Sequence, residues 1–297
     1  MGDVFSEPAV FDHAGISNQV LSDEVQTKFH LLRALLRPKL DAGLLVAFSG
    51  GVDSAFLAFA AESVRRDSGG KLLALTTLSE SFSQAERRDA DEFVRAHRIE
   101  HVWHRSDELA NPAYAINDLN RCFHCKSELF AICRRVANER GFEWIAYGYN
   151  ASDRGDVRPG HRAALENGIL SPLADAKMTK DDIRSLMRHF EVELADKPAS
   201  PCLSSRIMTG VAITPRKLRD VEELEAILRE GGLRVFRVRL HEDGEIRYVR
   251  LEVASDELDK AIELRDQFTA EALRRGFKWA MLDLAGYRTG GGNIAAK

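Results

Sequence analysis

The stretch Val46-Ala47-Phe48-Ser49-Gly50-Gly51-Val52-Asp53-Ser54 decides the fold. It closes a short apolar run and opens a helical apolar pattern, so it predicts a buried strand, a tight turn and a helix in direct succession. Glycines let the backbone turn sharply and approach an anion, and the free N–H groups at a helix start favour phosphate. Ser49 and Ser54 add hydroxyl donors, and Asp53 is placed to hold Mg²⁺. We therefore expect a phosphate loop; a Gly-Gly turn that only tightens a strand–helix corner is the plainer alternative.

The pattern around this loop is typical of a parallel sheet. Apolar runs at 44–48, 72–76, 100–104 and 144–148 alternate with helical patterns, among them one near 126–139. Strands of unbroken apolar character that alternate with helices indicate a sheet covered on both faces. We expect an α/β fold with a doubly wound parallel sheet.

A second pattern begins after residue 207. A helix that starts at Thr214-Pro215 precedes two alternating strands around the hairpin signal Asp243-Gly244, and a helix and a strand follow. This αββαβ order predicts a smaller α+β domain. The expected division of the chain is an N-terminal arm (1–22), the loop-bearing domain (23–207), the substrate or oligomerisation domain (208–289) and a disordered tail (290–297).

Composition excludes several classes of protein. The 297 residues are 44% apolar and 30% charged, which is ordinary for a soluble globular protein of two domains. A net charge of −4 does not favour nucleic-acid binding, and no run approaches the roughly 18 apolar residues of a membrane span. The first residues lack the basic start and apolar stretch of a secretion signal, so we expect a cytoplasmic protein.

Three of the four cysteines form a candidate metal site. Cys122 and Cys125 are three residues apart just before a predicted helix, and Cys202 follows the proline-rich approach to Cys202-Leu203-Ser204-Ser205-Arg206. Such thiols can hold a [4Fe–4S] cluster, a zinc ion together with His124, or act as plain thiols. Cys133 falls on an apolar helix face, where we expect a buried core cysteine.

The loop resembles that of the N-type ATP pyrophosphatases, which split ATP between the α and β phosphates and form an adenylate. It is not the Gly-x-x-x-x-Gly-Lys-Ser/Thr loop, because the lysine is missing. Over residues 25 to 290 the chain resembles the LarE family of ATP-dependent sulfurtransferases. The stretches that carry this likeness are Ala47–Ser54, Tyr147-Gly148-Tyr149-Asn150 with Asp153 and Arg158-Pro159-Gly160, Ser200–Arg206, Arg237-Val238-Arg239-Leu240-His241 and Leu282–Arg288.

The resemblance implies adenylylation of pyridinium-3,5-biscarboxylic acid mononucleotide and replacement of oxygen by sulfur, in the synthesis of the nickel-pincer nucleotide cofactor. One branch of the family takes the sulfur from the cysteine that matches Cys202 and lacks the Cys-x-x-Cys. Because this sequence has Cys122 and Cys125, it resembles the branch in which three cysteines hold a [4Fe–4S] cluster that carries the sulfide. A sacrificial role for Cys202 is thereby in doubt, whereas its place in the active site is supported. The family precedent is a homo-oligomer.

Further site residues follow from spacing and from the resemblance. Arg237 and Arg239 lie two apart on a strand and share one face, so with Arg206 they are candidates for the substrate phosphate. The alternative is a solvated strand face paired with Glu252. The other candidates for ATP binding are Lys180 and Gly148, and those for catalysis are Cys202, Asp53 and Glu225. A surface lysine is the plainer interpretation of Lys180. A solvated helix glutamate is the plainer interpretation of Glu225.

Two other functions use the same motifs. A tRNA thiolase, or another adenylylating enzyme with this loop, would share the loop and often the cluster, but the acidic balance and the Arg-Val-Arg strand disfavour it. A nucleotide-binding regulatory module with a structural zinc would perform no chemistry. The source that resupplies sulfur has no signature in the sequence.

Overall fold

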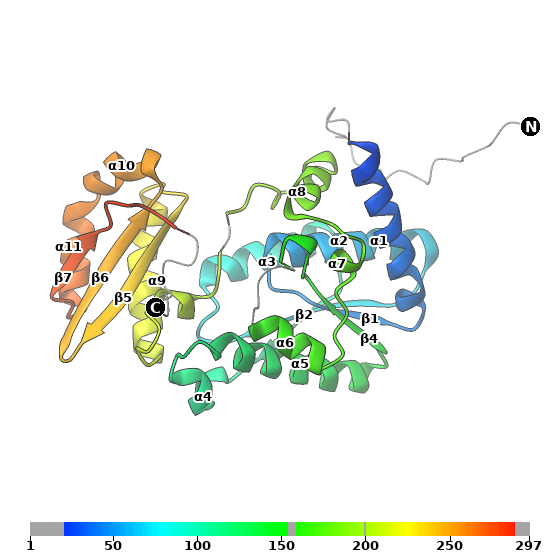
Figure 1. Cartoon of the computed structure of the whole chain (residues 1–297), viewed down its shortest axis with the longest axis horizontal. Helices are drawn as coiled ribbons and strands as arrows, with labels where there is room; N and C mark the ends of the chain where they lie inside the picture. Colours follow the sequence, from blue (N-terminus) through cyan, green and yellow to red (C-terminus); the bar gives the residue numbers. More distant parts are fainter. Residues whose placement is uncertain (1–20, 154–158, 199, 289–297) are drawn as a thin grey trace, which may run out of the picture. The chain divides into compact units, whose positions relative to one another are not determined.

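The computed structural model describes residues 21–153, 159–198 and 200–288 (Figure 1). These residues form two compact units, which are described separately. The first contains 21–78, 86–106 and 126–198, and the second contains 79–85, 107–125 and 200–288. The second unit therefore includes segments that precede residue 200, among them the Cys-x-x-Cys. The expected arm, apart from its last two residues, the expected tail and Arg158 lie outside the described residues.

The first unit is built on a four-stranded parallel sheet. Its order is β3-β2-β1-β4, formed by β1 (Leu44–Ala47), β2 (Leu72–Leu78), β3 (His101–Arg105) and β4 (Trp144–Tyr147). The helices that belong wholly to this unit are α1 (Asp23–Asp41), α2 (Val52–Ser68), α6 (Pro159–Glu166), α7 (Pro172–Asp175) and α8 (Lys180–His189). Two more, α3 (Gln84–Ala96) and α5 (Arg121–Arg140), have most of their residues here.

Helices cover both faces of this sheet, which confirms the predicted doubly wound α/β fold. In Figure 1, α2 and α3 lie on one side of the strands and α5 on the other, as right-handed crossovers require. The apolar runs form strands because both faces are buried: all four residues of β1 are buried. Ala47 pairs with Leu75 on one side and Tyr147 on the other, so the segments that follow β1 and β4 leave the sheet at the same edge.

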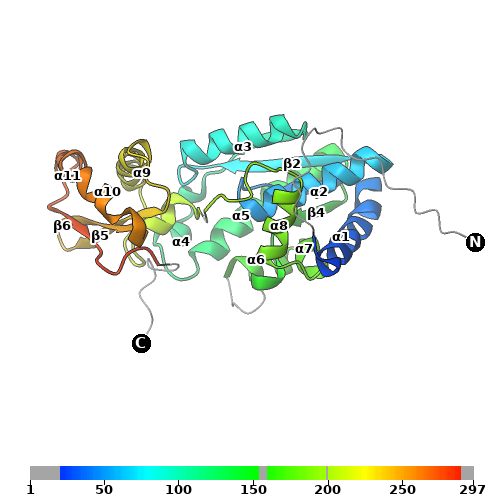
Figure 2. The same ribbon diagram turned by 90° about the horizontal axis from the view of Figure 1, so that it is seen from above.

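The second unit is a small α+β structure, as predicted. Its three-stranded sheet, of order β5-β6-β7, is formed by β5 (Phe236–Asp243), β6 (Ile246–Val253) and β7 (Trp279–Leu282). The other elements are η1 (Glu108–Ala110), α4 (Pro112–Ala115), η3 (Leu203–Arg206), α9 (Pro215–Glu230), η4 (Ser255–Glu257), α10 (Leu258–Glu263) and α11 (Arg265–Arg274). Figure 2 shows α9 and α11 on one side of β5 and β6, where the leucines of α9 and Phe268 of α11 join the apolar core with the sheet.

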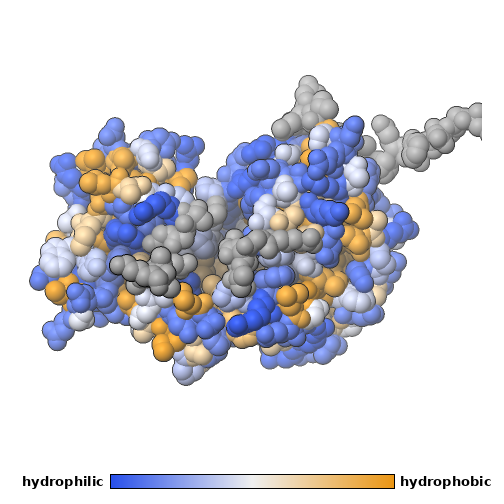
Figure 3. Space-filling view, viewed as in Figure 1, coloured by the Kyte–Doolittle hydropathy of each residue, from blue (hydrophilic) through white to orange (hydrophobic). Residues whose placement is uncertain are grey.

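Each unit has its own apolar core. The core of the first unit joins α1, α2 and the strands, and that of the second joins α9, β5 and β6. The face of the molecule seen in Figure 3 is mainly hydrophilic, with apolar side chains in small groups. None of the helices within the described ranges combines the length and apolar character needed to cross a lipid bilayer.

Candidate functional site

The predicted phosphate loop joins β1 to the first turn of α2. Gly51 caps α2 and has no side chain that would occupy the first N–H groups of the helix. The Ser54 hydroxyl donates to the carbonyl of Gly51 (3.0 Å) and accepts from the Ser49 amide (3.1 Å). The two serine hydroxyls lie 3.0 Å apart. The loop is thus braced by its own serines while the amides of the helix start remain available to an anion.

Two glycines are required by the geometry of this loop. Gly50 has a backbone φ of +70°, which residues other than glycine rarely adopt. Gly148, directly after β4, packs against the start of α2. A Cβ on Gly148 would lie 2.5 Å from the Ser54 nitrogen and 2.8 Å from the Asp53 carbonyl carbon. The edge that holds the loop therefore has no room for a side chain at position 148.

Asp53 contacts two residues at this edge that the sequence analysis singled out. Lys180 is a predicted ATP ligand, and Asn150 lies in a stretch that carries the family resemblance. Lys180 Nζ lies 2.6 Å from Asp53 Oδ2, and Asn150 Nδ2 donates to Asp53 Oδ1 at 3.1 Å. Lys180 is the first residue of α8, whose start is fixed by a capping box between Thr179 and Asp182. Lys180 is thus ion-paired beside the loop, and its contact with ATP stays a prediction. Carboxylate and amide oxygens at this place suit Mg²⁺, which prefers hard oxygen ligands.

The Cys-x-x-Cys lies inside a helix, which corrects the prediction that the helix begins at 126. α5 begins at Arg121 because the Asn120 carbonyl accepts from the amides of Phe123 and His124 (2.8 and 3.2 Å). Cys122 and Cys125 therefore lie in the first turn, three residues apart and on one face. Cys122 is exposed and Cys125 half-buried, and Cys202, which belongs to the same unit, precedes η3.

Charges couple Cys122 and Cys202 to Arg121. Burial raises the pKa of the Cys202 thiol, and the positive charge of Arg121 opposes this rise. Burial alone would lower the pKa of Arg121, but negative charge at Cys202 and Cys122 raises it. Arg121 also donates to the carbonyl of Ser204 (3.0 Å). Arg121 thus counteracts part of the effect of burial at Cys202, and the thiolate is the form of cysteine that metals bind.

The structure leaves the choice of metal at the cysteines open. Within the described ranges, no three or more His, Cys, Asp or Glu side chains are grouped closely enough to hold a metal ion. All four cysteines are described and none forms a disulfide. Cys133 is fully buried, as predicted, and burial raises its pKa to about 12.

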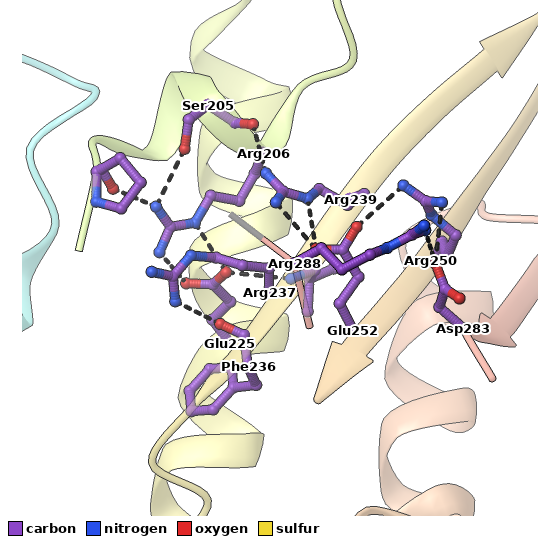
Figure 4. Close-up of polar contacts among 12 residues, drawn as sticks. Ser205, Arg206, Glu225, Phe236, Arg237, Arg239, Arg250, Glu252, Asp283 and Arg288 are labelled. Atoms are coloured by element: carbon purple, nitrogen blue, oxygen red, sulfur yellow. Dashed lines mark hydrogen bonds and ion pairs between the residues drawn. The ribbon is translucent and has the colours of Figure 1, made fainter. Parts of the chain in front are cut away.

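Arginines and carboxylates gather on the face of the small sheet opposite its apolar core (Figure 4). Arg206 forms a two-pronged ion pair with Glu225, at 2.9 and 3.0 Å. Arg239 pairs with Glu252 at 2.9 Å and donates to the Ser205 carbonyl at 2.9 Å. The solvated-face alternative is wrong for these residues, because all four charged side chains are buried. That alternative also predicted that a strand arginine pairs with Glu252, and the pair between Arg239 and Glu252 confirms this part of it.

Arg237 lies between these two pairs. Its burial and the neighbouring charge of Arg206 lower the pKa of the guanidinium, and its charged end lies 5.1 Å from the centroid of the Tyr287 ring. Arg250 and Arg288 extend the cluster through Asp283, at 3.1 and 3.4 Å. The group of residues 206, 225, 237, 239, 250, 252, 283 and 288 holds five arginines and three carboxylates, an excess of cations that favours an anionic ligand.

Glu225 is not a solvated helix residue. Burial alone would raise its pKa, but the charge and hydrogen bonds of Arg206 lower it, together with a bond from the Val238 amide (3.1 Å). An ionised carboxylate held in this way orients Arg206 and β5. This geometry suits a positioning role for Glu225.

Sequence reasoning missed a buried polar network beside the cysteines. The Glu108 carboxylate accepts from the hydroxyls of Ser79 (2.9 Å), Ser81 and Tyr114 (2.8 Å), and the Tyr114 hydroxyl lies 2.6 Å from that of Ser204. Ser204 is two residues from Cys202, so the network fixes the cysteine loop. No motif signals it, because its members come from four separate segments.

The fold and the loop together define an α/β protein of a phosphate-loop class, with a parallel sheet and a Ser-Gly-Gly-x-Asp-Ser turn before α2. No family model matches the chain. Full-length comparisons do find relatives. An uncharacterised protein of Synechocystis sp. is 36% identical over 83% of this chain and 90% of its own length.

Two further relatives match a similar part of the chain. The pyridinium-3,5-bisthiocarboxylic acid mononucleotide synthase of Lactiplantibacillus plantarum is 28% identical over 82% of this chain and 87% of its own. An uncharacterised protein of Methanocaldococcus jannaschii is 25% identical over 83% of this chain and 91% of its own length. The similarity to this synthase supports the resemblance to the LarE family that the sequence motifs indicate, and the chain belongs to one family with the Synechocystis protein.

Proposed function

We propose that this protein is an ATP-dependent sulfurtransferase of nickel-pincer nucleotide cofactor synthesis. Its substrate would be pyridinium-3,5-biscarboxylic acid mononucleotide, and its product the corresponding thiocarboxylate. The observation that carries the proposal is the match, over 82% of the chain, to a synthase whose name specifies the bis-thiocarboxylic product. The phosphate loop and the three cysteines provide chemistry that this conversion needs.

The first step activates a carboxylate. One carboxylate oxygen attacks the α-phosphorus of ATP, the bond between the α and β phosphates breaks, and pyrophosphate leaves with the bonding electrons. The amides of the loop and Lys180 stabilise the negative charge that develops, and Asp53 would hold the Mg²⁺ that shields it. The acyl-adenylate makes AMP the leaving group in place of an oxide.

The second step exchanges oxygen for sulfur. A sulfur nucleophile forms a bond to the activated carbonyl carbon, and the bond to AMP breaks. When bound by Cys122, Cys125 and Cys202, a [4Fe–4S] cluster would supply the sulfide. Arg121 favours the thiolate ligands, and Glu108 and Tyr114 fix the loop that carries Cys202. Each turnover consumes one sulfur atom, so continued turnover requires an external donor of reduced sulfur.

The arginine cluster would hold the substrate by its phosphate. Arg206, Arg237 and Arg239 present buried guanidinium groups on one face of the second unit, and their charge is only partly balanced by Glu225 and Glu252. In the whole cluster, five arginines face three carboxylates, and a phosphate dianion would balance the remaining positive charge. We further propose a cytoplasmic homo-oligomer, in keeping with the family precedent.

Pyrophosphate release tests the proposal. Purified protein with ATP and Mg²⁺ should release pyrophosphate when the pyridinium dicarboxylate mononucleotide is added, and tRNA should have no effect. Stimulation by tRNA alone would support the thiolase alternative instead. No release with either acceptor would contradict the proposed adenylylation.

A further inference from the structure

Lys197 reaches the phosphate loop from a segment that follows α8. Its Nζ lies 3.2 Å from the Gly50 carbonyl oxygen and 2.7 Å from Oδ2 of Asp89 on α3, and its side chain is only 14% exposed. The loop motif itself contains no lysine, unlike the common Gly-Lys-Ser/Thr loop. Lys197 therefore brings a cation to a loop whose own sequence lacks one.

The backbone at Lys197 is held in place by α8. Arg184 donates to the carbonyls of Ala195 (2.5 Å) and Lys197 (2.8 Å), which ties this segment to the helix. The same helix begins with Lys180, whose ammonium pairs with Asp53. One helix thus places two lysines at the loop, Lys180 at the Asp53 end and Lys197 at the Gly50 end.

The present partners of Lys197 are weak ones. Asp89 is 40% exposed, and an ion pair with a half-exposed carboxylate adds little stability. A polyphosphate bound in the loop would offer the ammonium several charged oxygens at once. Exchange of one carboxylate for a polyphosphate therefore favours the bound state.

We propose that Lys197 is a second phosphate-binding residue of the ATP site, and that its ammonium leaves Asp89 to bind the β,γ-pyrophosphate group of ATP. Negative charge accumulates on this group when the bond between the α and β phosphates breaks, so a cation there stabilises the leaving group. The inference rests on the proposed use of ATP and adds a specific contact to it.

Equilibrium binding of ATP and of AMP to the full chain, both with Mg²⁺, tests this inference. Lys197→Met should weaken ATP binding roughly ten- to a hundredfold and AMP binding less than about threefold, because AMP lacks the β and γ phosphates. Lys197→Arg should keep most of the ATP affinity. Asp89→Asn should retain or strengthen it, because the competing carboxylate is gone.

Lys39→Met is the matched control. Lys39 lies in the same unit, on α1, and its Nζ lies 3.4 Å from the centroid of the Trp144 ring, so its replacement should leave ATP binding unchanged. Unaltered ATP affinity in Lys197→Met, or equal losses for ATP and AMP, would overturn the inference while the proposed function stands. A wild-type protein that binds no ATP would contradict the proposed function itself, and this inference with it.

Discussion

Arg206 and Glu225 face each other in a two-pronged ion pair, with side chains only 5% and 2% exposed. The pair links η3, which follows Cys202, to α9, and Glu225 also accepts the amide of Val238 in β5. Removal of one partner would leave a charge buried without its counter-charge. The pair therefore couples the cysteine loop to the arginine face.

Replacement of Glu225 should be costly in stability. Glu225→Ala is expected to lower the free energy of unfolding by about 3–5 kcal/mol, because the Arg206 charge stays buried. The double variant Arg206→Met/Glu225→Leu should lose much less. Urea unfolding of the full chain measures both, with Glu230→Gln at the exposed end of α9 as control. A double variant as unstable as Glu225→Ala would contradict this account.

A methyl group at position 148 should disturb ATP binding. The Cβ of Gly148→Ala would lie 2.5 Å from the Ser54 nitrogen, so the start of α2 must move. We expect at least about a tenfold loss of ATP affinity, the equivalent of about 1.4 kcal/mol. Isothermal titration with ATP measures the loss, and circular dichroism checks that the fold persists. Unchanged affinity would show that the edge beside β4 tolerates a side chain.

His241 should make the protein sensitive to acid. Burial, with the positive charges of Arg250 and Arg239, lowers its pKa from 6.5 to about 4. As the pH falls from 6.5 to about 4, His241 takes up a proton in the unfolded chain before it does so in the folded chain. The free energy of unfolding therefore falls in this pH range, and His241 does not change it above pH 6.5. His241→Gln should reduce the loss.

Urea unfolding of wild type and His241→Gln at neutral pH and near pH 5 measures this difference. His30→Gln, which changes an exposed histidine on α1, is the control. Identical pH dependence in wild type and His241→Gln would show that His241 takes up no proton on unfolding in this interval.

The three cysteines should hold iron, and Cys133 should not. Protein purified without oxygen is expected to contain about four irons per chain with matching acid-labile sulfide, and Cys122→Ala should lose both. Cys133→Ala should keep them, because Cys133 is buried and burial raises its pKa to about 12. Iron-free protein after reconstitution would leave Cys202 as a sacrificial donor.

Local patterns predicted the parallel sheet and the loop because both depend on residues that are adjacent in sequence. Strands buried on both faces must be apolar throughout, and Ser49–Ser54 carries its own turn chemistry. The start of α5 was missed because Arg121–Cys125 shows no helical apolar period, although Asn120 is a common residue at helix starts.

Pairing between segments could not be predicted in the same way. Arg237 lies opposite Glu252 in the strand register, yet the ion pair runs diagonally from Arg239, and Arg250 binds the other carboxylate oxygen of Glu252. Glu108 and Lys197 acquire their partners only when distant segments fold together. Their roles depend on tertiary structure that no local pattern encodes.

The most direct test of the central claim is the mass of the nucleotide formed in one experiment. Protein purified without oxygen, ATP, Mg²⁺ and pyridinium-3,5-biscarboxylic acid mononucleotide are incubated, and the nucleotide product is analysed by mass spectrometry. We expect a product in which sulfur replaces a carboxylate oxygen, formed together with AMP, and no such product with Cys202→Ala. Recovery of only unmodified substrate from wild-type protein that is loaded with iron and sulfide would contradict the claim.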